Sequence, residues 1–161
     1  MATIFKGAEV NSALNARIAA DVEALKARGV EPKLGIIRVG ERPDDLSYER
    51  TAEKRAEKLG VAVEKIVLPE DVSQAELLGV IKGVNENPLI HGVLLFRPLP
   101  KHLDEDAVCN ALAPEKDIDG ITDLSCAGVF AGKELGFAPC TPSACMEILE
   151  HYGVELRGKK A

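Results

Sequence analysis

Tryptophan is absent from the sequence, and aromatic residues make up only 4% of its 161 residues. Long apolar runs are absent as well, since none approaches the ~18 residues of a membrane-spanning helix. Basic residues form no block and the net charge is -6, so neither a membrane nor a nucleic acid is an expected partner. The four cysteines lack Cys-x-x-Cys spacing and the three histidines are scattered. These patterns predict no metal site and favour reduced thiols in the cytoplasm.

Two further patterns are missing. No Gly-x-Gly-x-x-Gly or Walker-type loop occurs, so no dinucleotide or phosphate loop can be recognised in this chain. Residues 1–6 do not have the form of a signal peptide. What remains is ordinary for one globular domain with a real core: 46% hydrophobic and 29% charged residues.

Hydrophobic spacing predicts alternating helices and strands. A Ser73-x-x-Glu76 capping box marks the start of one helix, and Thr141-Pro142 marks another. The expected helices span residues 10–25, 46–59, 73–85, 104–112 and 141–152, and the expected strands span 34–39, 61–68 and 92–96. This alternation predicts an α/β fold with an open parallel sheet and right-handed crossovers.

A binding site is expected at the carboxyl ends of the strands, in Gly40–Asp45, Arg97–Pro100 and Asp117–Gly120. The most informative of these turns is Pro114–Gly120, which sets two aspartates between a proline and a glycine. An Asp beside Gly can bring a carboxylate and open backbone close to a ligand. A bare Asp-x-Asp in a loop more often caps a turn. That structural reading is the one favoured here for Asp117.

The chain resembles the amino-terminal catalytic domain of the bifunctional methylenetetrahydrofolate dehydrogenase/methenyltetrahydrofolate cyclohydrolase family from about Lys6 to Ala161. The motifs that carry the resemblance, in order, are Val39-Gly40, Tyr48, Lys58 to Val61, Gly92 to Leu94, Pro98-Leu99-Pro100, Pro114 to Gly120, Pro139 to Pro142, Gly153 and Gly158 to Lys160. The resemblance implies that residues 1–161 form a folate-binding catalytic domain. It also implies a Rossmann domain for NADP or NAD after residue 158. Residues 156–161 look like the start of a further strand, so the chain is expected to be a fragment.

The resemblance also implies residue roles. Asp119 matches the Asp that binds the pterin edge, a task suited to a carboxylate because the pterin offers parallel N–H donors. Tyr48 matches the catalytic-site Tyr that lies against the aminobenzoyl ring. The implied substrate-binding residues are Tyr48, Phe96, Arg97, Pro98, Leu99 and Asp119. Cys140 and Thr141 match the turn that joins the two domains.

Three positions depart from the family pattern. The usual catalytic Lys, four residues after the Tyr and on the same helix face, is Ala52. The position of its usual Gln partner is occupied by Phe96. Where the family has a Ser three residues before the Tyr, this chain has Asp45, which is expected to be a helix N-terminal acid. Lys54 is about 240° around the helix from Tyr48, so it points elsewhere. Arg55 returns to the Tyr48 face about 10 Å further along.

The implied function is oxidation of 5,10-methylenetetrahydrofolate with a nicotinamide cofactor, and in the family also hydrolysis of the methenyl product to 10-formyltetrahydrofolate. Ala52 and Phe96 leave open a dehydrogenase without cyclohydrolase activity. A non-catalytic folate-binding α/β module is the alternative from another class. For Arg97, a pocket role and a solvated strand end are both open. A cytoplasmic homodimer in one-carbon metabolism and purine biosynthesis is the expected setting.

Overall fold

The computed structural model describes residues 4–160, so Met1–Thr3 of the segment examined for a signal peptide lie outside it. The elements, in chain order, are α1 (Gly7–Ala27), β1 (Lys33–Val39), α2 (Pro43–Leu59), β2 (Ala62–Leu68), α3 (Gln74–Glu86), β3 (Gly92–Leu95), α4 (Glu105–Ala111), the 3-10 turn η1 (Pro114–Lys116), α5 (Asp123–Ala131) and α6 (Cys140–His151). No described helix is long and apolar enough to cross a membrane.

The three strands form one parallel sheet in the order β2-β1-β3. Ile36 of β1 is paired with Lys65 of β2 on one side and with Leu94 of β3 on the other. Helix α2 leads from β1 to its neighbour β2, and α3 leads from β2 past β1 to β3, so helices connect the parallel strands. The predicted open parallel α/β sheet is confirmed.

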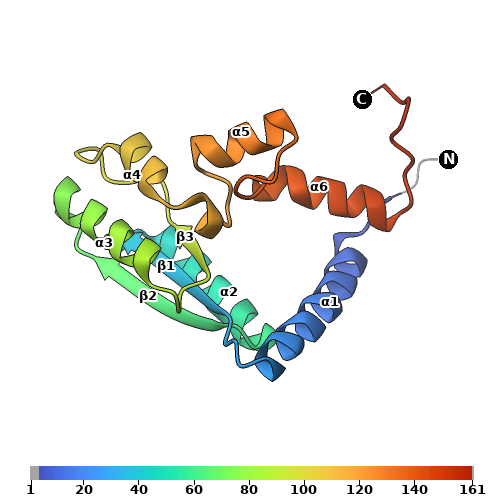
Figure 1. The fold of residues 1–161 in the computed structure, drawn as a ribbon, viewed down its shortest axis with the longest axis horizontal. Coiled ribbons are helices and arrows are strands. Elements are labelled where there is room, and N and C mark those ends of the chain that lie inside the picture. The colour runs from blue at the N-terminus through green and yellow to red at the C-terminus, as the bar shows by residue number, and fades with distance from the viewer. Residues whose placement is uncertain (1–3, 161) are drawn as a thin grey trace.

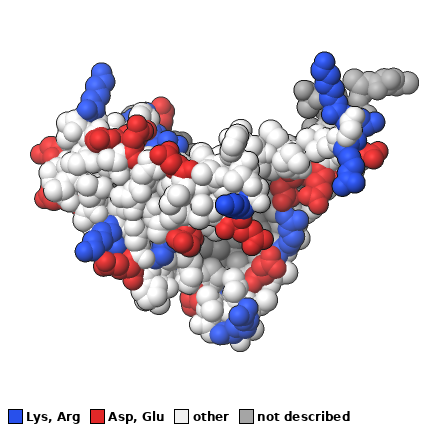
Figure 2. Space-filling model, turned by 45° about the horizontal axis from the view of Figure 1, so that its top comes forward, with Lys and Arg blue, Asp and Glu red and all other residues white. Residues whose placement is uncertain are grey.

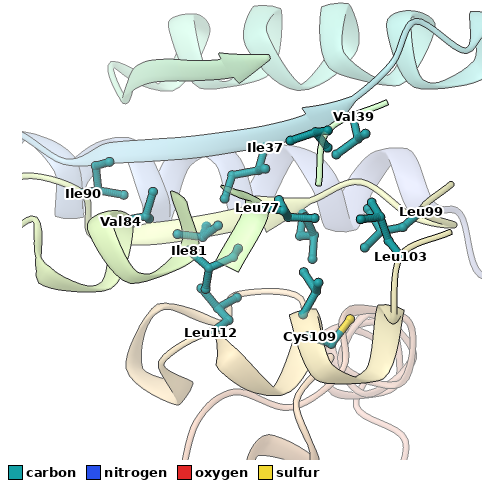
Figure 3. Close-up of a cluster of buried hydrophobic side chains, with 14 residues drawn as sticks. Ile37, Val39, Leu77, Ile81, Val84, Ile90, Leu99, Leu103, Cys109 and Leu112 are labelled. Carbon is teal, nitrogen blue, oxygen red and sulfur yellow. The ribbon is translucent and has the colours of Figure 1, made fainter. Parts of the chain in front are cut away.

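One face of the sheet carries the main core (Figure 3). Ile37 of β1 and Val93 of β3 pack there against Leu77 and Ile81 of α3, and Leu112, just after α4, closes the cluster. Helix α3 begins with the predicted capping box, in which Ser73 and Glu76 satisfy each other's backbone N–H groups. The loop and helix that follow β3 are therefore held firmly against this face.

The opposite face is covered by α2, which contacts β1 and β2. Side chains alternate along a strand, so Ile36 and Arg38 point to this face while their neighbours enter the main core. Helix α1 contacts α2 and α6, and it runs diagonally between them in Figure 1. Helices α5 and α6 lie together at the end of the molecule away from α3.

The structure differs from the sequence prediction at several points, and helix α1 begins at Gly7, three residues before its predicted start. Helix α5, Asp123–Ala131, was not predicted. Helix α2 begins at Pro43, three residues before the predicted start, with Pro in its first turn. Between residues 154 and 160 the chain forms turns and no strand, because no neighbouring strand in the described chain offers it backbone partners.

Candidate active site

The turn that contains Asp119 is built around the buried carboxylate of Asp117. Its two oxygens accept hydrogen bonds from the backbone N–H groups of Ile121, at 3.0 Å, and Thr122, at 2.9 Å, and from the hydroxyl of Ser125, at 2.7 Å. Burial by itself raises the pKa of Asp117, but these hydrogen bonds hold the pKa below its ordinary value. Asp117 is therefore a structural acid, as its sequence context favoured.

Two glycines bring this turn close to its neighbours. Gly120 has φ +65°, and a Cβ there would lie 2.6 Å from the backbone nitrogen of Pro139, just before α6. A Cβ on Gly92 of β3 would lie 2.5 Å from Cγ2 of Ile118. Both close approaches are possible only because glycine has no side chain. They fix Asp119 between the edge of the sheet and the start of α6.

Asp119 faces a cavity of about 370 Å³ on the α2 side of the sheet. We call it the Asp119 cavity; its lining residues are Arg42, Asp44, Asp45, Tyr48, Leu94, Leu95, Phe96, Arg97 and Asp119. They come from the start of α2, the end of β3 and the turn after η1. The cavity therefore lies at the carboxyl ends of β1 and β3, the position expected for a site in an open parallel sheet.

An aromatic pair forms one part of this cavity. The ring of Tyr48 meets the ring of Phe96 edge to face, with centroids 5.5 Å apart and planes at 68°. Phe96 is buried at the end of β3, whereas 59% of Tyr48 is exposed. The contact with Phe96 holds one part of the Tyr48 ring, and the exposed part is available to a ligand.

Ala52 lies one helical turn beyond Tyr48, beside a second space of about 470 Å³ that we call the apolar hollow. Tyr48, Ala52, Arg55, Leu34 and Ile118 are among the residues that line it. The expected return of Arg55 to the Tyr48 face is confirmed, and its guanidinium donates to Asn15 Oδ1 at 2.9 Å. Lys54 is exposed and lines neither space.

A buried ion pair anchors the start of α2 to the sheet. Arg38 Nε lies 2.8 Å from Glu49 Oε2, and both side chains are almost fully buried. Arg38 also donates to the carbonyl of Gly40, and Lys65 Nζ approaches Glu49 Oε1 at 3.6 Å. Glu49 directly follows Tyr48, so this cluster fixes the part of the helix that presents the tyrosine.

The structure does not bring Pro98 and Leu99 to the Asp119 cavity. Leu99 packs in the main core, and both residues border a third space, of about 770 Å³, which shares Arg42 with the Asp119 cavity. Leu99 turns inward because its backbone N–H is held by Glu105 Oε2 at 2.7 Å. Their predicted substrate contacts therefore require a ligand that extends past Arg42.

The position of Arg97 is compatible with both of its predicted interpretations, the pocket role and the solvated strand end. It lines the Asp119 cavity, and its partly exposed guanidinium lies 3.8 Å from Glu105. Cys140, the first residue of α6, has its thiol 3.3 Å from the carbonyl oxygen of Ile118. Burial, and then the neighbouring carboxylate of Asp119, raise the pKa of the Cys140 thiol, so it is not an activated nucleophile.

Besides Leu94 and Leu95 of β3, three cavity residues were not predicted individually to bind substrate: Arg42, Asp44 and Asp45. The signal was present, since they follow β1 within the Gly40–Asp45 turn that was expected to border the site. Asp45 does lie in the first turn of α2, as expected. Helix position alone, however, does not reveal that the end of β3 lies opposite.

Neither a cluster of metal ligands nor a dinucleotide loop is recognised among the described residues. Within residues 4–160, no three His, Cys, Asp or Glu side chains gather as metal ligands. The loop after β1, Gly40–Arg42, contains one glycine, so it does not match the three-glycine cradle of a dinucleotide phosphate.

On the face drawn in Figure 2, acidic and basic side chains are interspersed among the described residues.

A parallel sheet with a carboxylate, an aromatic pair and a cavity at its carboxyl edge is the arrangement in which α/β domains commonly bind small molecules. The family model described as "Tetrahydrofolate dehydrogenase/cyclohydrolase, catalytic domain" matches residues 5–119. The chain belongs to this tetrahydrofolate dehydrogenase/cyclohydrolase family.

Relatives and solved structures agree with this assignment. The chain is 46% identical over 157 residues to the bifunctional protein FolD of Clostridioides difficile, covering 98% of this chain and 55% of that protein. The crystal structure of the bifunctional FolD enzyme of Campylobacter jejuni matches with a TM-score of 0.94 at 31% identity, over 98% of this chain and 56% of that one. Trypanosoma brucei FolD, complexed with NADP cofactor and inhibitor, matches with a TM-score of 0.87 at 32% identity, over 98% of this chain and 54% of that one. The chain spans about half the length of these relatives.

Proposed function

We propose that the protein containing this chain oxidises 5,10-methylenetetrahydrofolate to 5,10-methenyltetrahydrofolate with a nicotinamide dinucleotide. The observation that carries the proposal is the Asp119 cavity, in which a carboxylate and the Tyr48–Phe96 pair border one space of about 370 Å³. A pterin offers an N–H edge to a carboxylate, and an aminobenzoyl ring offers a flat face to a tyrosine. The C. jejuni and T. brucei relatives are methylenetetrahydrofolate dehydrogenase/cyclohydrolases.

In this proposal Asp119 holds the pterin edge and Tyr48 lies against the aminobenzoyl ring. Phe96 supports the tyrosine edge to face, and Arg97 borders the ligand from the end of β3. Pro98 and Leu99 contribute only where the ligand extends past Arg42, towards the third space. Tyr48 is the proposed catalytic-site residue of the chain, since the usual Lys position is Ala52.

The nicotinamide dinucleotide, NADP or NAD, is proposed to bind outside the described residues, in a Rossmann domain that follows residue 158. The structure of the T. brucei relative is a complex with NADP. A yeast dehydrogenase, from Saccharomyces cerevisiae, matches at 20% identity, and that likeness supports the fold alone. Within this chain, residues 1–161 are proposed to form the folate-binding catalytic domain.

Hydrolysis of the methenyl product is the activity that separates two versions of the proposal. Ala52 and Phe96 replace the Lys and Gln that the family resemblance leads one to expect. Ala52 faces the apolar hollow, and neither side chain can move a proton. This favours a dehydrogenase with weak or no cyclohydrolase activity. A folate-binding module without catalysis is the third possibility.

One experiment separates these possibilities. The intact protein is assayed for reduction of NAD and NADP with 5,10-methylenetetrahydrofolate, and separately for hydrolysis of 5,10-methenyltetrahydrofolate. Both activities indicate the bifunctional enzyme, the first alone indicates the monofunctional dehydrogenase, and folate binding without turnover indicates the module. Absence of folate binding would refute the proposal.

The remaining parts of the proposal concern the setting of the enzyme. We propose a cytoplasmic homodimer that supplies one-carbon units, purine biosynthesis included. Light scattering of the intact protein tests the dimer, and cell fractionation tests the location. Growth that comes to depend on added purines after deletion of the gene would support the biosynthetic role.

A further inference from the structure

Asp45 is a carboxylate without a hydrogen-bond donor from the described chain. Its side chain is only 12% exposed, and its nearest cation, Arg42 Nε, lies 4.0 Å from Oδ2. That distance is outside hydrogen-bond range. Arg42 is itself 47% exposed and donates to the carbonyl of Pro98 at 3.1 Å. No side-chain oxygen of the described residues is fully buried without a partner, so the Asp45 carboxylate still reaches solvent and remains available to a ligand that brings positive charge or a donor.

The surroundings of Asp45 favour positive charge in the same cavity. Asp44, Asp45 and Asp119 face it, against two cations, Arg42 and Arg97. Arg97 is turned partly to Glu105, at 3.8 Å. The Tyr48–Phe96 pair adds aromatic rings, whose faces attract cations. Asp45 lies three residues before Tyr48 on α2, so the two side chains share one face of the helix.

The reaction proposed above creates a cation on the folate. The C–H bond of the methylene carbon breaks, and the hydride leaves with both electrons for the oxidant, a nicotinamide dinucleotide. The lone pair of an adjacent nitrogen then forms a C=N bond, and the neutral N–CH₂–N unit becomes an amidinium with one positive charge. An anionic group that faces this unit stabilises the transition state more than the ground state.

We propose that Asp45 stabilises the positive charge that develops on the folate during oxidation, and that the Asp119 cavity thereby prefers the cationic methenyl form over neutral folates. This inference rests on the proposed function. It assigns to the first turn of α2 a role in the chemistry, in addition to its role in the helix.

The test is Asp45→Asn in the intact protein, with two ligands and no nicotinamide present. Affinities for 5,10-methenyltetrahydrofolate, a cation, and tetrahydrofolate, whose ring system is neutral, are measured by displacement of a fluorescent folate immediately after mixing. We expect the methenyl affinity to fall about tenfold and the tetrahydrofolate affinity to stay within about twofold. In turnover, kcat should fall about ten- to hundredfold while KM for the methylene substrate changes little.

Three further variants separate this role from a merely structural one. Asp45→Glu keeps the charge and should keep most of the methenyl preference. Glu57→Gln removes an exposed charge from the same helix, away from the spaces described above, and should change neither affinity. Arg42→Met should bind the methenyl cation at least as tightly as the unaltered protein, because it removes a competing cation.

The outcomes are distinct. An equal loss for both ligands, or no loss for either, would overturn the role of Asp45 while leaving the proposed function intact. A selective methenyl loss in Arg42→Met would also overturn it, since Asp45 would then act only by holding Arg42. If the unaltered protein binds neither folate, the proposed function fails and this inference fails with it.

Discussion

Asp119 owes its position to its neighbours. Asp117 closes the turn behind it through hydrogen bonds from Ile121, Thr122 and Ser125. Gly120 lets the chain pass directly against Pro139. Asp117 thus stabilises the turn, while Asp119 faces the cavity. Substitution of Asp117 should therefore affect the turn, and substitution of Asp119 should affect ligand binding.

Asp119→Asn should weaken folate binding. The change keeps the shape of the side chain but places an N–H donor against the donors of a pterin. A buried mismatch of this kind costs about 1–3 kcal/mol, a ten- to hundredfold loss of affinity. Folate titration of the intact variant measures the loss, and Asp71→Asn in an exposed loop serves as the control. Unchanged folate affinity would remove Asp119 from the site.

Ala52→Lys combined with Phe96→Gln should raise hydrolysis of 5,10-methenyltetrahydrofolate more than it raises hydride transfer. General acid–base help changes rates by about 10²–10⁴, whereas hydride transfer depends mainly on positioning. Phe96→Gln alone also removes the edge contact to Tyr48, so both single variants are assayed beside the double. The expectation fails if the unaltered protein already hydrolyses the methenyl compound as fast as it oxidises the methylene one.

The strand pattern alone could place the turns Gly40–Asp45, Arg97–Pro100 and Asp117–Gly120 at one edge of the sheet, and the family resemblance added the roles of Asp119, Tyr48 and Phe96. The sequence placed Asp45 in a turn that borders the site but could not show that its side chain faces the cavity, since helical periodicity gives a direction around α2 but not what lies opposite. It also could not show that Leu99 turns into the core. That orientation is set by packing and by the carboxylate of Glu105. The ligand roles of these residues remain predictions.

At the scale of elements, the site depends on how α2 is seated on β1. The contact between them is a buried pair of opposite charges, Arg38 and Glu49, in a strand that is otherwise apolar at its centre. Lys65 of β2 adds a second cation and reaches Glu53 at 2.8 Å. Side-chain charges from two strands thus fix the rotation of the helix that carries Tyr48.

Arg38→Met should destabilise the fold by about 3–5 kcal/mol, because it leaves the carboxylate of Glu49 buried with only a more distant cation. Adding Glu49→Leu removes the orphaned charge and should recover most of the loss. Chemical denaturation of the single and double variants measures both changes. If the double variant is as unstable as the sum of the two single variants, the pair is not coupled in the way described.

Most elements could be predicted from local signals: apolar periodicity for α2 and α3, the capping box of α3, and the apolar run of β3. Helix α5 was missed because Asp123–Ala131 is short and almost uniformly small or apolar, without a polar face to set a period. Its start depends on the Thr122 side chain, which accepts from Ser125 N at 3.0 Å, and on the distant packing of Asp117. Such nonlocal support is not visible in a sequence window.

At the scale of the whole molecule, the described chain carries the proposed folate site, and no dinucleotide loop is recognised among the described residues. All three strands of its sheet are used in one small α/β unit, and the loop after β1 does not match a dinucleotide cradle. The curated relatives are nearly twice as long. The two halves of the proposed reaction are therefore expected to be carried by different parts of the protein.

The 161-residue chain on its own should not bind NAD or NADP appreciably. Calorimetric titration with each cofactor up to millimolar concentration should give no isotherm, while the intact protein should bind one of them. The intact protein is the control that shows the cofactor to be active. A clear isotherm with the isolated chain would show that a dinucleotide site lies within these residues.

The backbone contact at Gly120 has a consequence at the level of the gene. A Cβ at this position would lie 2.6 Å from Pro139 N and 2.8 Å from the carbonyl oxygen of Phe137, and these are backbone atoms that cannot turn aside as a flexible side chain would. Every missense change that a single base can make in a glycine codon introduces a Cβ. No single-base missense mutation of this codon can therefore avoid displacing the turn that holds Asp119 or the segment that leads into α6. Variation at this codon should be confined to synonymous changes in any population that needs the enzyme.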